Sequence, residues 1–111
     1  MPRPDYIAKL QEAIRTTHDC ESRHITTVPV SEQFRGEVAW QGPVEIFDLI
    51  GHQTATCCYA WGHEDTGGRP HSTTVLGVPP VDSAHAAVKV AIAAKADEAR
   101  RIRNLISGWA N

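Results

Sequence analysis

The stretch SAHAAVKVAIAAKADEARRIRNLISGWAN, residues 83–111, contains no proline, only one glycine and many alanines. Alanine and unbranched charged residues have high helix propensity. Apolar residues recur through the stretch at spacings of three and four, the pattern of a helix with one apolar face. These residues are Val88, Ala91, Ile92, Ala99, Ile102, Ile106 and Trp109. The stretch therefore predicts a long C-terminal helix over about residues 83–109, capped by Asp82 or Ser83.

Such a helix would be too long for the body that it packs against. About 26 residues at 1.5 Å each span nearly 40 Å, more than the width of a domain of this size. Its end should therefore overhang, unless the helix breaks near Asp97 and folds back. The overhang would carry an apolar stripe of Ile102, Leu105, Ile106 and Trp109, with three arginines among them. An exposed stripe of this kind usually meets a partner, so these four residues form a candidate interface, most simply with a second copy.

The N-terminal part of the chain predicts a shorter helix over about residues 5–17, with Asp5 as its N-cap. Its apolar positions again have helical spacing: Tyr6, Ile7, Leu10, Ala13 and Ile14. The helix should end at residues 16–19, where two threonines and then Asp19 replace good helix formers.

Between the two helices the sequence favours extended backbone and turns. Strands are predicted over about residues 22–34, 37–50, 54–63 and 70–78, rich in β-branched and aromatic residues. Pro29 indicates an edge strand or a bulge, because proline cannot donate a ladder hydrogen bond. Gly42-Pro43 makes the second segment either one bent strand or two. The segment Asp65-Thr66-Gly67-Gly68 predicts a hairpin.

These elements predict an α+β fold in a single domain, residues 1–111, with an antiparallel meander of three or four strands. In the third strand Ala55, Cys57, Tyr59 and Trp61 share one face, and we expect this bulkier set to face the helices. Both helices would then pack on the same face of the sheet.

Composition limits the partners and the cell compartment. The net charge is −2 and the sequence pI is near 6.3, so no overall positive field draws the chain to nucleic acid or to an anionic membrane. No run of about 18 apolar residues and no secretory signal pattern occur. Three cysteines make an odd, sparse set, which favours reduced thiols. We therefore expect a cytoplasmic protein that does not bind membranes.

Histidines and cysteines supply the candidate metal site. His18, Cys20 and His24 place three possible zinc ligands within seven residues. No second pair with ligand spacing occurs elsewhere, so the alternative is a small buried cysteine between two rim histidines, and no cofactor is predicted. His63 and His71 should face one another across the hairpin, as a metal-binding or pH-sensing pair or as a solvated edge pair.

A pocket between sheet and helices would use His24, His52, Cys58 or Trp61 to bind a ligand. Catalysis by a cysteine would need a neighbouring base, and within an extended strand both nearby histidines lie too far from Cys58. No catalytic motif of high specificity occurs, so the sequence does not predict an enzyme. The strand acids Glu32, Glu37, Glu45 and Asp48 are expected on the solvated face, and Trp40, Tyr59 and Trp61 in packing.

Two resemblances follow from particular residues. The segments AIRxTHxCESRH (13–24), VPV (28–30), FDLxGH (47–52) and CYAW (58–61) resemble a family of short bacterial hypothetical proteins with no assigned activity, over roughly residues 5–96. The likeness implies a bacterial cytoplasmic origin. The helix–meander–helix order, with Gly42-Pro43 and Phe47, is also loosely similar to double-stranded RNA-binding domains. The lysine cluster that those domains place at the start of the last helix is missing from VDSAHA (81–86), which disfavours nucleic acid.

The sequence thus ranks four classes of function. The first is a non-enzymatic interaction or assembly module that acts as a homodimer or binds another protein. The second is a small-molecule-binding protein or small enzyme with a pocket between sheet and helices. Metal binding and nucleic-acid binding come last.

Overall fold

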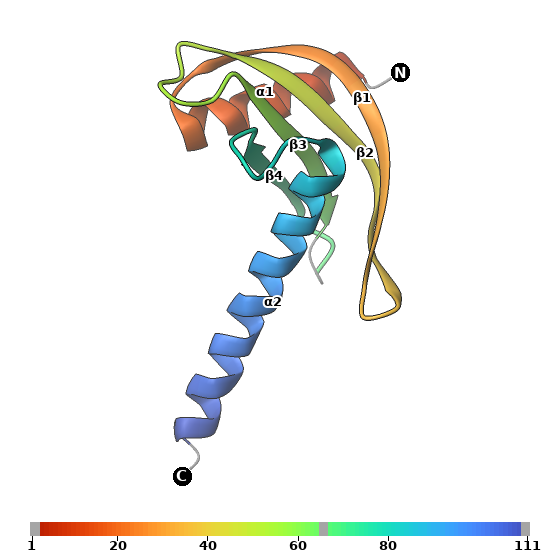
Figure 1. Cartoon of the computed structure of the whole chain (residues 1–111), viewed down its shortest axis with the longest axis vertical. Coiled ribbons are helices and arrows are strands. Elements are labelled where there is room, and N and C mark those ends of the chain that lie inside the picture. Colours follow the sequence, from red (N-terminus) through yellow and green to blue (C-terminus); the bar gives the residue numbers. More distant parts are fainter. Residues whose placement is uncertain (1–2, 65–66, 110–111) are drawn as a thin grey trace.

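The computed structural model describes the backbone of residues 3–64 and 67–109 and the side chains through Ala96 in the C-terminal helix. Six elements follow one another: α1 (Pro4–His18), β1 (Glu21–Phe34), β2 (Glu37–Ile50), β3 (Cys57–Glu64), β4 (Pro70–Leu76) and α2 (Ala84–Trp109) (Figure 1). The α+β fold is confirmed, with four strands, and every boundary lies within three residues of its predicted position.

Helix α1 begins one residue earlier than predicted. Arg3, with extended backbone, is the N-cap, and Pro4 occupies the first helical position. Proline suits that position because its fixed φ fits the helix and its missing N–H breaks no hydrogen bond. Asp5, the predicted cap, instead lies in the first turn, where its carboxylate faces the positive end of the helix dipole. The helix ends because Asp19 turns left-handed, at φ 54°, and donates its N–H to the Arg15 carbonyl.

The strands form one antiparallel sheet in the order β1-β2-β3-β4, so each strand pairs with its neighbours in sequence. The hairpin of β1 and β2 closes at Arg35-Gly36, both at positive φ. Pro29 lies in an edge strand, as predicted, and is paired with Pro43 of β2. Strand β2 runs through Gly42-Pro43 without interruption, so the predicted bent segment is one strand.

The hairpin between β3 and β4 is also confirmed. His63 pairs with His71 and Glu64 with Pro70, so the two strands are joined by a short connection. Of the predicted turn segment 65–68, residues 65–66 lie outside the described residues.

The two helices lie on opposite faces of the sheet, and the prediction of a shared face is wrong. Alternate residues of β3 show this. Tyr59 and Trp61 pack in one core with Val88 of α2. Cys58 and Ala60 pack in a second core, with the α1 residues Leu10 and Ile14. Side chains alternate along a strand, and here both faces are apolar, so each face needs a helix to cover it.

Helix α2 is a single element of 26 residues, and no break occurs near Asp97. Ser83 caps it, as one of the two predicted caps, and its Oγ accepts the Ala86 N–H at 3.1 Å. At 1.5 Å per residue the helix is about 39 Å long. Figure 1 shows its N-terminal turns beside the sheet and the remainder extending away from it, which gives a molecule of 50 × 29 × 27 Å.

We call residues 97–109 of α2 the extension, and the predicted interface residues lie in it. The backbone of Ile102, Leu105, Ile106 and Trp109 is helical, while their side chains lie outside the described residues. Among the residues described, no helix combines the length and the apolar character needed to cross a membrane.

Candidate functional site

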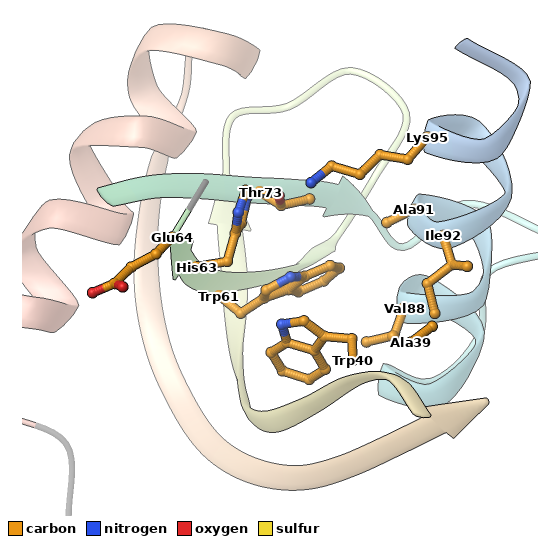
Figure 2. Close-up of a pocket in the computed structure, with 10 residues that line it drawn as sticks. All are labelled: Ala39, Trp40, Trp61, His63, Glu64, Thr73, Val88, Ala91, Ile92 and Lys95. Atoms are coloured by element: carbon orange, nitrogen blue, oxygen red, sulfur yellow. Dashed lines mark hydrogen bonds between the residues drawn. The ribbon is translucent and has the colours of Figure 1, made fainter. Parts of the chain in front are cut away.

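A cavity of about 200 Å³ lies where the sheet divides. Strands β2 and β3 pair only from Glu45 opposite Ala60 to Asp48 opposite Cys57. Beyond Ala60, β3 remains paired with β4 as far as Glu64, while the other half of β2 follows β1. The strands therefore separate, and on the α2 side the gap between them is only partly filled (Figure 2).

Two tryptophans form the aromatic wall of this cavity. The ring centroids of Trp40 on β2 and Trp61 on β3 are 5.5 Å apart, and the rings are tilted by 49°. Trp61 is only 3% exposed. Gly42 lets the Trp40 ring lie against the strand, because a Cβ at position 42 would come within 3.1 Å of that ring. Both tryptophans therefore pack, as predicted, and also line a space.

Helix α2 closes the other side of the cavity with small and branched apolar residues. Val88 lines it together with Ala91 and Ile92, which follow one turn later along the helix. Lys95 follows on the same side and is exposed. Figure 2 shows its chain reaching over the cavity, with the amino group turned toward Thr73. Within the part of the chain described, Lys95 forms no ion pair.

The remaining rim is polar. His63 Nε2 lies 2.9 Å from Thr73 Oγ1, and the imidazole stacks on His71 with ring centroids 5.7 Å apart. The predicted facing of these two histidines is thus confirmed. Glu64 also borders the cavity, but its carboxylate points away from the tryptophans and from Lys95 (Figure 2). The cavity thus combines an apolar interior with a cation at its mouth.

A second polar group lies on the α1 face, buried within the sheet. Glu45 is fully buried, which corrects its predicted place on the solvated face. Its Oε1 is 2.8 Å from His24 Nε2 and also accepts the Thr27 hydroxyl, while Oε2 has no hydrogen-bond partner among the described residues. The β1 bulge between His24 and Thr26 brings both donors to one side of the strand.

The sequence only partly predicts that Glu45 is buried. A carboxylate in a strand of alternating polar and apolar residues gives no sign of burial on its own. The signal is the apolar character of both faces of β2, since Val44 and Ile46 face α2 while Phe47 faces α1. With no solvated face near the middle of the sheet, Glu45 must be buried and must be paired.

The four predicted ligand-binding residues do not form one site. Trp61 lines the cavity, whereas Cys58 is on the opposite face of the same strand. His24 lies against Phe47 and pairs with Glu45. His52 stabilises the turn after β2, where its Nδ1 accepts the N–H groups of Thr54 and Ala55 at 3.1 and 3.0 Å.

The predicted metal ligands also have separate partners. His18 Nε2 is 2.8 Å from Thr74 Oγ1, and burial, together with nearby His52, lowers the pKa of His18. Cys20 is buried beside Phe47, while His24 pairs with Glu45. Among the described residues, no three histidine, cysteine or acidic side chains gather as a metal site would require. The structure therefore does not bring His18, Cys20 and His24 together as a ligand set.

The cysteines are placed for packing. Burial raises the pKa of the Cys58 thiol to about 12, and it also raises the pKa of Cys20. A thiol attacks only as the thiolate, so neither residue is prepared for nucleophilic chemistry.

Comparison with known proteins found no matching family model, no matching curated protein and no matching solved structure.

Proposed function

We propose that this protein is a non-enzymatic assembly module that forms a homodimer through the C-terminal part of α2. One observation carries the proposal: the α2 backbone continues as helix to Trp109, although, among the described side chains, the last one that packs against the core is Ile92. Figure 1 shows the later turns leaving the body. A helix of this length is not needed to cover the sheet.

The sequence of the extension favours a partner. The four apolar residues Ile102, Leu105, Ile106 and Trp109 recur at spacings of three, one and three, the spacing of a packing seam. Isolated helices gain most of their stability from packing an apolar face. A second copy is the simplest partner, because a twofold axis lets the same seam cover itself.

The chain's resemblance to short bacterial proteins without assigned activity supports a bacterial cytoplasmic setting for this module. The low net charge agrees with a protein partner better than with nucleic acid. Neither buried thiol, Cys20 or Cys58, has its pKa lowered toward the range of a nucleophile, which supports a role other than catalysis.

Light scattering tests the proposal. The full chain should have the mass of a dimer at micromolar concentration and dissociate on dilution, and a chain ending at Ala96 should be a monomer. The shortened chain keeps Ala84, Ala87 and Val88, so its circular dichroism should still show a folded body. A full chain that remains monomeric at every concentration would rule out the homodimer.

A further inference from the structure

The cavity between β2, β3 and α2 has features that assembly does not require. We propose that it binds a small aromatic carboxylate, with the ring against Trp40 and Trp61 and the carboxylate at Lys95. This binding is separate from dimerisation, because every residue that lines the cavity lies before the extension of α2.

The size of the cavity selects a ligand with one ring. Its volume is about 200 Å³. An apolar cavity of about 150 Å³ is enough for benzene, so a benzene ring with one small substituent fits here. A nucleotide or a larger cofactor would extend well beyond it, since pockets for drug-sized ligands are about 300–1,000 Å³.

The shape of the walls selects an aromatic body. The two indoles border the cavity and are tilted by 49° to one another, so a third ring can add to this aromatic cluster in the tilted or offset arrangements that aromatic groups prefer. Opposite them, Val88 and Ile92 supply aliphatic contacts. Trp61 is buried in the core and its neighbours hold it in place, so little side-chain freedom is lost when a ligand enters.

The charge at the mouth selects an anion. Lys95 extends across the cavity, and the rim carboxylate of Glu64 is turned away from it (Figure 2). A carboxylate on the ligand would receive a charge-assisted hydrogen bond from the ammonium group. The Thr73 hydroxyl, toward which Lys95 points, adds a polar contact at the same end. An aromatic amine would instead meet a like charge.

Calorimetric titration of the full chain with benzoate, compared with neutral benzamide, tests this site. We expect saturable benzoate binding at millimolar concentration or below, and weaker binding of benzamide. Lys95→Gln should weaken benzoate about three- to tenfold and leave benzamide unchanged, as removal of one partly exposed charge partner does. Lys89→Gln, an exposed lysine of the same helix outside the cavity, is the matched control and should change neither.

A second pair of variants locates the binding. Ala91→Phe fills the cavity and should abolish benzoate binding, while Ala94→Phe adds the same ring on the exposed side of α2 and should preserve it. The inference is overturned if benzoate does not saturate the wild-type chain, if benzamide binds equally well, or if Lys95→Gln or Ala91→Phe binds benzoate as the wild type does. Light scattering on the same samples reports dimerisation separately, so a monomer that binds benzoate would refute the assembly proposal alone.

Discussion

The two faces of the sheet are covered by one helix each, but they are built differently. On the α1 face β3 presents the small residues Cys58, Ala60 and Gly62, so the helix approaches closely. Tyr6 touches the backbone there, and its hydroxyl accepts the Gly62 N–H at 2.8 Å. On the α2 face β3 presents Tyr59 and Trp61, and α2 meets them with alanines and Val88.

This difference indicates which face of the sheet is fully packed and which face leaves space for a ligand. On the α1 face, Leu10, Ile14 and Phe47 are at most 1% exposed. On the α2 face, a cavity remains where β3 has separated from β2. Stability is therefore expected to depend mainly on the α1 face, and binding on the α2 face.

Truncating an aliphatic residue on each face should show the largest contrast. Leu10→Ala removes a side chain that is 1% exposed and should lower the free energy of unfolding by about 3 kcal/mol. Ile92→Ala, half-buried beside the cavity, should lower it by only about 1 kcal/mol. Urea unfolding measures both. Equal losses would show that the two faces are packed equally well.

The buried carboxylate gives the next largest effect. His24→Ala leaves Glu45 with one hydrogen-bond donor and should lower the free energy of unfolding by about 2 kcal/mol. Arg23→Ala breaks an exposed ion pair with Asp48 and should cost less than about 0.5 kcal/mol. If His24→Ala and Arg23→Ala destabilise the protein equally, the hydrogen bond from His24 does not stabilise the buried Glu45 carboxylate.

The adjacent cysteines provide a chemical comparison of the faces. Iodoacetamide should modify Cys57, half-buried on the α2 face, at least about tenfold faster than Cys58, whose thiol is fully buried with a pKa raised to about 12. Peptide mass spectrometry after timed labelling assigns each site. Denaturant should make the two rates similar. Preferential labelling of Cys58 in the folded protein would contradict the assignment of the faces.

The smallest expected effect is on pH dependence. The pKa of His18 is lowered in the folded protein, first by burial and then by His52. The unfolded chain therefore takes up this proton at a higher pH, near 6.5, and stability should decrease as the pH falls from about 6.5 toward the folded pKa. His18→Gln should flatten this part of the profile of urea midpoint against pH. An unchanged slope would show that His18 does not contribute.

Local patterns in the sequence predicted the elements well because each element has its own marker. Pro4 and Asp19 mark the ends of α1, and the spacing of Val88, Ala91 and Ile92 marks α2. Antiparallel strands joined by short turns then have few possible orders, which is why the meander was predictable.

Placement on a face was not predictable, because it depends on contacts between distant segments. Bulky residues of β3 were expected to face both helices, but small residues on the other side allow α1 to approach more closely. The cavity depends on where β2 leaves β3, which no residue of either strand marks alone. Trp61 was predicted as a ligand residue, whereas Lys95 was not, since a lysine on an exposed helix has no distinguishing signal.

Two single substitutions in the extension of α2 test whether this segment forms the dimer. Ile106 belongs to the apolar spacing of residues 102–109, whereas Asn104 falls outside it. We predict that Ile106→Asp shifts the full chain from dimer to monomer in light scattering, while Asn104→Asp leaves it a dimer and both keep the near-ultraviolet circular dichroism of a folded body. If the Ile106→Asp chain remains a dimer, or if both substitutions dissociate the dimer equally, the apolar residues of the extension do not form the interface.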